Sequence, residues 1–190
     1  MHKGRLEIIC GSMFSGKTEE LIRRLRRASY ARASVQAFKH AFDTRVGTAH
    51  IHAHGGDRLP AAAVSKSHEI IELCQPEAHI IGIDEIQFFD MGIVHAVMQL
   101  VESGKRVVAS GLDLDFRGVP FGPMPELLAR ADEVVKLRAV CAHCSADAHF
   151  TQRLVNGKPA RANDPVVLIG AEECYQARCR NCYVLAPANY

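Results

Sequence analysis

The stretch that decides the fold is residues 11–18, Gly11-Ser12-Met13-Phe14-Ser15-Gly16-Lys17-Thr18. It matches the phosphate-loop pattern G-x-x-x-x-G-K-[ST] in full. The short apolar run Leu6–Cys10 precedes it, which predicts a strand. From Thr18 to about Ala33, apolar residues recur at helical spacing, which predicts a helix. Strand, glycine-rich loop and helix are the setting that this motif requires, so we expect the loop to bind a nucleotide phosphate.

Each residue of this loop is a candidate phosphate contact, and two side chains have distinct roles. Lys17 is expected to reach the terminal phosphates as a point charge, and the Thr18 hydroxyl to hold Mg²⁺. Asp84 ends the apolar run His79–Asp84, which predicts a carboxylate beside that metal at the edge of a parallel sheet. Glu85 follows directly and could activate water or deprotonate a substrate hydroxyl. A solvated loop glutamate is the simpler alternative.

The first two thirds of the chain alternate apolar runs with helical patterns, as parallel α/β units do. We therefore predict an α/β fold, with a P-loop (RecA-like) parallel sheet covered by helices on both faces. The segment Asp43–Asp57 shows no clear period and is expected to be a loop. The remaining predicted elements are strands at 34–39, 79–84, 106–110 and 133–140, and helices at 68–75, 92–103 and after Pro125.

Composition excludes several classes of protein. The 190 residues are 48% hydrophobic and 23% charged, which rules out a disordered chain. No apolar run approaches the roughly 20 residues of a membrane span, and the N-terminus lacks an export signal. We expect a soluble, cytoplasmic protein without a membrane partner.

The net charge of +2 is too small to indicate a nucleic-acid partner. Four arginines cluster in the first helix, at positions 23, 24, 26 and 27. We expect them on its outer arc, forming a solvated or intersubunit face.

Two C-x-x-C pairs, Cys141–Cys144 and Cys179–Cys182, are separated by 34 residues. Four thiolates suit a closed tetrahedral zinc site, which we expect to be structural. A redox dithiol is the minority alternative, and His143 and His149 are unnecessary as substitute ligands. We divide the chain into a nucleotide-binding domain, 1–139, and a small zinc-binding domain, 140–190. The insertion between the pairs has zinc-anchored ends and a middle free to cover a ligand.

The motifs together resemble one family. The chain is similar to the zinc-containing (type II) class of thymidine kinase, in order along almost its whole length. The resemblance rests on residues 11–18, then Asp84-Glu85-Ile86-Gln87-Phe88-Phe89, Gly111-Leu112-Asp113-Leu114-Asp115-Phe116, Pro120-Phe121-Gly122, Val135–Cys141, Thr151-Gln152-Arg153-Leu154, and Tyr175 before the last cysteine pair.

This resemblance implies a phosphotransferase that moves the ATP γ-phosphoryl to the 5′-hydroxyl of thymidine, and also of deoxyuridine, in nucleotide salvage. Glu85 would be the general base, and Gln87 would lie in the same nucleotide-proximal motif. Asp43 and Arg45 match a loop that contacts ATP. The family is usually tetrameric and inhibited by dTTP.

The resemblance also implies a thymidine pocket. Leu112, Phe116 and Thr151 would line it, with Tyr175 beside the sugar. A lasso of Val166, Val167, Leu168, Ile169 and Gly170 would hydrogen-bond the base through its backbone.

The chain departs from the family pattern in two places. Ile86 stands where a small residue is common, which is expected to add bulk beside the base, and His40 stands where proline is frequent. Two other function classes stay open at this point: a zinc-ribbon ATPase acting on nucleic acid with Glu85 activating water, and a regulatory nucleotide-binding module without catalysis.

Overall fold

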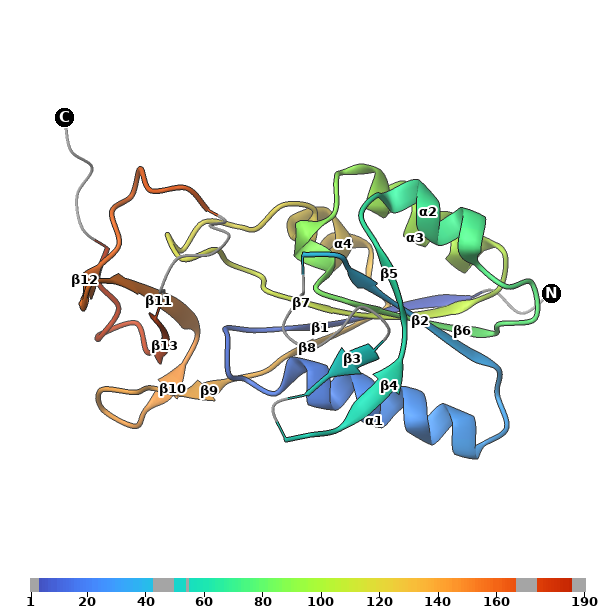
Figure 1. Ribbon diagram of the computed structural model, residues 1–190, viewed down its shortest axis with the longest axis horizontal. Helices are drawn as coiled ribbons and strands as arrows, with labels where there is room; N and C mark the ends of the chain where they lie inside the picture. Colours follow the sequence, from blue (N-terminus) through green and yellow to red (C-terminus); the bar gives the residue numbers. More distant parts are fainter. Residues whose placement is uncertain (1–3, 43–49, 54, 167–173, 186–190) are drawn as a thin grey trace.

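A six-stranded, all-parallel sheet forms the larger part of the molecule (Figure 1). The computed structural model describes residues 4–42, 50–53, 55–166 and 174–185. The strand order is β5-β2-β6-β7-β1-β8. The strands are β1 (Arg5–Cys10), β2 (Val35–His40), β5 (Ala62–Val64), β6 (Ile80–Asp84), β7 (Arg106–Gly111) and β8 (Glu133–Lys136).

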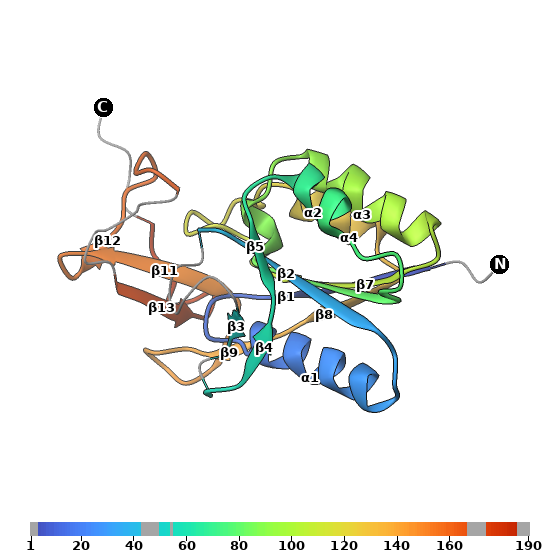
Figure 2. The ribbon, with the colours of Figure 1, turned by 45° about the vertical axis from the view of Figure 1, so that its right-hand side comes forward.

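Helices cover both faces of this sheet (Figure 2). Helix α1 (Lys17–Tyr30) lies on one face, and α2 (Ser67–Leu73), α3 (Gly92–Glu102) and α4 (Met124–Arg130) lie on the other. Alternate residues of β1 face opposite sides: Ile8 joins the core under α2–α4, whereas Ile9 packs with Leu21 and Leu25 of α1. The predicted α/β fold is confirmed.

The parallel strand pairing places the C-terminal ends of β1, β6 and β7 along one edge of the sheet. Cys10 at the end of β1 pairs with Gly111 of β7 and Lys136 of β8. Asp84 at the end of β6 pairs with Lys39 of β2. The phosphate loop, Asp84 and the segments after β7 therefore emerge along the same edge, where open α/β sheets bind ligands.

Several short elements were not predicted from sequence. The expected loop 43–57 contains strand β3 (His50–His52), which forms an antiparallel pair with β4 (Arg58–Pro60). Ile51 of β3 is fully buried against α1. Strand β5 and the 3-10 turn η1 (Ile86–Phe88) were also not predicted. Each has only three residues, too few for a period to show.

The C-terminal part contains β9 (Ala139–Val140), β10 (Asp147–Ala148), β11 (Phe150–Val155), β12 (Lys158–Pro159) and β13 (Cys174–Arg178). Strand β9 pairs with β10, and a second sheet has the order β12-β11-β13. Asn156 and Gly157 both have positive φ, as a two-residue hairpin turn requires. The division proposed between 139 and 140 falls inside β9. Among the described helices, none has the length and apolar character needed to cross a membrane.

Candidate active site and metal centre

The phosphate loop leaves β1 through backbone conformations that favour glycine. Gly11 has a φ of 143° and Gly16 a φ of 84°. A Cβ on Gly11 would lie 2.5 Å from the carbonyl oxygen of Leu137, so a side chain there would displace the neighbouring chain. Helix α1 begins directly after Gly16. Its first N–H groups and its dipole therefore face the loop, which favours an anion.

The side chains at this helix start contact the loop and the end of β6. Lys17 Nζ donates to the carbonyl oxygen of Ser12 at 2.8 Å, and Thr18 Oγ1 donates to Asp84 Oδ2 at 3.2 Å. Ser110 of β7 donates a short hydrogen bond to the other oxygen of Asp84. The structure thus brings together Thr18 and Asp84, as predicted, and adds Ser110. Ser110 was detectable only as a polar residue near a strand end.

The loop fits a phosphate and a hard metal ion. The hydroxyls of Ser12 and Ser15 are buried and make no hydrogen bond within the described residues. Unpaired buried donors are costly, and a phosphate would satisfy them. The Thr18 hydroxyl and the Asp84 carboxylate are oxygen ligands of the kind that Mg²⁺ prefers.

Glu85 has a constrained backbone just after Asp84, with a φ of 54°. Gln87 is buried, and its Nε2 donates to Glu85 Oε2 at 2.6 Å. The backbone N–H of Leu112 donates to Gln87 Oε1 at 3.1 Å. Gln87 therefore connects Glu85 to the segment after β7. Left-handed residues outside glycine concentrate at functional sites.

Two residues of β11, Thr151 and Arg153, connect this site to the C-terminal sheet. The backbone N–H of Met13, inside the phosphate loop, donates to Thr151 Oγ1 of β11 at 3.0 Å. The Arg153 guanidinium is buried, 5.0 Å from the Phe116 ring centre, and donates to the carbonyl oxygen of Pro165 at 2.6 Å. Sequence reasoning did not assign a role to Arg153.

Other predicted residues are placed as follows. Asp43, Arg45 and residues 167–170 of the lasso lie outside the described residues. Val166 is partly buried at the end of a described segment, and Tyr175 of β13 lies opposite Arg153 in the β11–β13 ladder. The side chain of Ile86, expected to add bulk beside the base, is fully buried in the core in this structure.

The four predicted cysteines form one cluster. The Sγ atoms of Cys141, Cys144, Cys179 and Cys182 all lie within 4.8 Å of one another. Each pair is closed by backbone bonds: Ser145 N–H donates to the Cys141 carbonyl at 2.9 Å, and Cys182 N–H to the Cys179 carbonyl at 3.1 Å. The sulfurs form a closed four-thiolate donor set that fits zinc.

Electrostatics within the cluster also fit a cation. Burial acts to raise the pKa of Cys141, but backbone hydrogen bonds from Cys179, His143 and Cys144 lower it to about 6. Contacts with the sulfurs of Cys179 and Cys144 raise the pKa of Cys182 to about 12. One thiolate therefore opposes ionisation of its neighbour, and a metal ion would remove that opposition.

A phosphate loop at the start of α1, facing a buried aspartate at the end of a parallel strand, defines a P-loop nucleotide-binding α/β protein. The family model described as thymidine kinase matches residues 4–183. The chain belongs to the thymidine kinase family, and the four-cysteine cluster is consistent with its zinc-containing class. The protein is therefore a kinase, with a general role in transferring phosphoryl groups to nucleosides.

A solved structure shows the same fold at low sequence identity. The flagellar accessory protein FlaH from Methanocaldococcus jannaschii has a TM-score of 0.50 and 12% identity. The match covers 84% of this chain and 76% of that one. This similarity concerns the fold alone.

Proposed function

We propose that the protein transfers the γ-phosphoryl group of ATP to the 5′-hydroxyl of thymidine, and of deoxyuridine, giving the nucleoside monophosphate and ADP in nucleotide salvage. The observation that carries this proposal is the hydrogen bond between Gln87 and Glu85, one residue beyond the Thr18–Asp84 pair. A carboxylate held next to a phosphate loop is suitably placed to receive a proton from the acceptor hydroxyl.

The phosphate loop would hold ATP. Its backbone N–H groups and the Ser12 and Ser15 hydroxyls would bind the phosphate oxygens, and Lys17 would follow the charge of the transferred group. Thr18 and Asp84 would hold Mg²⁺, which neutralises phosphate charge when bound. Asp43 and Arg45 would contact ATP from the first loop.

Glu85 would act as the general base. The thymidine 5′-oxygen forms a bond to the γ-phosphorus, and its proton passes to Glu85. The bond between the γ-phosphorus and the bridging oxygen breaks, and its electrons remain on ADP. Lys17 stabilises the charge on the group in transit.

The acceptor would lie between the segment after β7 and the C-terminal sheet. Leu112, Phe116 and Thr151 would surround the base, with Tyr175 beside the sugar. The backbone of Val166–Gly170 would read the base, because its apolar side chains offer no hydrogen bonds. Cytosine reverses the donor and acceptor pattern at N3 and C4, so deoxycytidine would be rejected.

Several finer properties follow from the family resemblance and are part of the proposal. The protein would work in the cytoplasm as a homotetramer, without nucleic-acid or membrane partners, and dTTP would inhibit it by feedback. The cysteine cluster would hold one structural Zn²⁺ ion. Residues 140–190 would form a zinc-binding lasso domain beside the nucleotide-binding domain 1–139.

A coupled assay of ADP release with a panel of deoxynucleosides tests this function. We expect turnover with thymidine and deoxyuridine and none with deoxycytidine, deoxyadenosine or deoxyguanosine. ATP turnover without a nucleoside, stimulated by DNA, would contradict the proposal. The Lys17→Ala variant should lose activity with every acceptor.

A further inference from the structure

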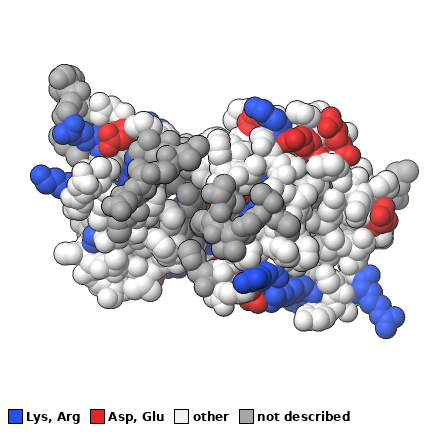
Figure 3. Space-filling model, in the orientation of Figure 1, with Lys and Arg blue, Asp and Glu red and all other residues white. Residues whose placement is uncertain are grey.

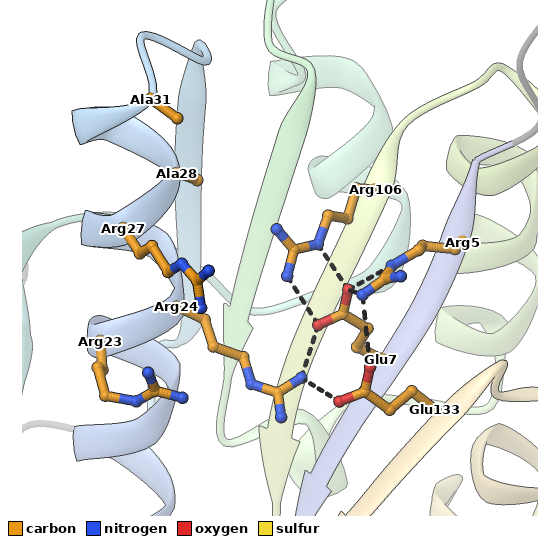
Figure 4. A pocket seen from close by; sticks show the side chains of 9 residues that line it. All are labelled: Arg5, Glu7, Arg23, Arg24, Arg27, Ala28, Ala31, Arg106 and Glu133. Carbon is orange, nitrogen blue, oxygen red and sulfur yellow. Dashed lines mark hydrogen bonds and ion pairs between the residues drawn. The ribbon is translucent and has the colours of Figure 1, made fainter.

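A cavity lies away from the phosphate loop, between α1 and the strand ends at the opposite edge of the sheet (Figure 4). Its volume is about 630 Å³, within the range of small-molecule sites. Arg5, Arg106 and Glu133 are the first residues of β1, β7 and β8 and line its floor. Among the residues that the structure describes, none of those assigned to the proposed active site lines this cavity.

Arginines dominate the lining. Five are present, at positions 5, 23, 24, 27 and 106, against Glu7 and Glu133, a surplus of three positive charges. Glu20 pairs with Arg23 and Arg24 and reduces the surplus to two. Figure 3 shows Lys and Arg side chains gathered over α1 on the face that it draws. The cavity therefore has a positive field that an anion would neutralise.

A buried glutamate holds three of these arginines in place. Glu7 is fully buried and accepts from Arg24 Nη1 at 2.6 Å, Arg106 Nε at 2.6 Å and Arg5 Nε at 2.5 Å. This corrects the expectation that all four arginines of the first helix lie on an outer arc, because Arg24 reaches inward to the sheet. The guanidinium groups are thereby fixed before any ligand arrives, which reduces the entropy cost of binding.

Donors remain available in this fixed arrangement. Within the described part of the chain, Arg24 Nη2 and Arg106 Nη1 make no hydrogen bond, and Arg27 has no acceptor at all. Figure 4 shows Arg24 and Arg27 extending from α1 toward the strands that carry Glu7 and Arg106. Planar guanidinium groups with free N–H donors match phosphate oxygens.

The rest of the lining limits what the ligand can be. Ala28 and Ala31 provide the apolar part, and none of the described residues that line the cavity is aromatic. A nucleobase would find no ring to stack on, so recognition must come from charge and from guanidinium hydrogen bonds.

We propose that this cavity is a second anion site, which binds a phosphate-bearing ligand of at least two negative charges through Arg24, Arg27 and Arg106. The ligand is a phosphate chain, either inorganic or part of a nucleotide. The site binds the phosphates and does not contact a nucleobase. The site is separate from the proposed active site: Arg27 lies ten residues after Lys17, roughly 15 Å along α1.

Isothermal titration calorimetry with inorganic tripolyphosphate tests the site. All proteins carry Lys17→Ala and are titrated without Mg²⁺, so that the phosphate loop contributes little. Arg27→Glu removes a solvent-exposed arginine of the cavity. Arg32→Glu makes the same charge change five residues later, outside the cavity, and is the matched control.

We expect one bound tripolyphosphate per chain, at least tenfold weaker binding in Arg27→Glu, and a change below twofold in Arg32→Glu. GTP should bind about as tightly as tripolyphosphate. The proposal is overturned by no binding, by equal losses in both variants, or by much tighter binding of GTP. It is also overturned if tripolyphosphate does not bind and Arg27→Glu lowers the mass seen by sedimentation, because the cavity would then be a contact between copies.

Discussion

Glu7 has no exposed surface, yet it stays ionised because three guanidinium groups surround it. Burial alone would raise its pKa, but hydrogen bonds from Arg106, Arg5 and Arg24 lower the pKa to about 2. A carboxyl whose pKa is lower in the folded state stabilises the fold above its unfolded pKa, near 4.5. That stabilisation is lost as the pH falls from about 5 toward 2.

We therefore predict that Glu7→Gln lowers the free energy of unfolding by about 3 kcal/mol at pH 7, because it removes the buried anion that pairs with three arginines and leaves the mostly buried Arg24 without it. The difference from wild type should shrink between pH 5 and pH 3, as Glu7 becomes protonated in the unfolded wild type. Urea unfolding of both proteins at a series of pH values measures this difference in the free energy of unfolding. Glu126→Gln, which removes an exposed pair with Arg130, is the control and should change stability by less than about 0.5 kcal/mol.

The proposed base gives a second prediction for a single residue. Glu85→Gln keeps the shape and removes the proton acceptor, so kcat should fall roughly 10²–10⁴-fold while ATP affinity stays within about twofold. Steady-state rates with thymidine and equilibrium binding of ATP measure the two quantities. Wild-type turnover in this variant would eliminate Glu85 as the base.

The sequence predicts those site residues that stand at a fixed spacing in a motif. It does not predict the residues that come into contact only when distant strands and helices pack together. The phosphate loop, Asp84 and the four cysteines follow local patterns. Ser110 meets Asp84 only because β7 lies beside β6. Arg24 meets Glu7 only because the folded chain packs α1 against β1.

At the scale of an element, the two cysteine turns should fold only with their metal. Metal analysis should find one zinc per chain, and Cys141→Ser or Cys182→Ser should lower both zinc content and melting temperature. Cys74→Ser is the matched control, because Cys74 lies outside the cluster and should leave both unchanged. Protein purified without chelators that has no metal and a Cys141–Cys144 disulfide would contradict the zinc site.

The segment between Gly157 and Val166 supports the proposed lasso. Shortening it should raise the KM for thymidine at least tenfold and the KM for ATP far less, because only the acceptor side would be disturbed. Exchanging Val167 or Leu168 for another apolar residue should change the thymidine KM little if the backbone reads the base. Normal thymidine affinity in the shortened enzyme, or deoxycytidine acting as a substrate, would disprove this reading.

Helices and strands were predicted correctly where a long run of buried residues leaves a clear hydrophobic pattern in the sequence. Strands β1, β6 and β7 are mostly apolar and buried along nearly their whole length, and α1 shows a clear apolar stripe. Strand β3 has a single buried isoleucine, Ile51, between two histidines. Three residues do not show a hydrophobic pattern, and Ile51 is buried because it packs against α1. Helix α4 begins at Met124, one residue before Pro125, since proline needs no N–H acceptor in a first turn.

At the scale of the whole molecule, the hydrogen bond from the Met13 N–H to Thr151 joins the phosphate loop to the C-terminal sheet. Thr151→Val keeps the side-chain shape and removes the acceptor of the Met13 N–H. A buried unpaired N–H costs about 1–2 kcal/mol, so kcat/KM for ATP should fall roughly five- to thirtyfold, in addition to any effect on thymidine. Thr151→Ser restores the acceptor and should recover most of the loss. If Thr151→Val affects thymidine alone, the two parts act independently.

The pairing of β11 with β13 has a consequence for how such an enzyme changes over generations. The chain between Val155 and Cys174 leaves and re-enters the same small sheet, and the cysteine turns lie beyond the other end of the β11–β13 ladder, where Phe150 pairs with Arg178. Insertions and deletions within it alter one connection and leave the strand order of the parallel sheet intact. If this span reads the acceptor, as proposed, changes in its length or sequence would alter the acceptor that is recognised and leave the phosphate loop unchanged.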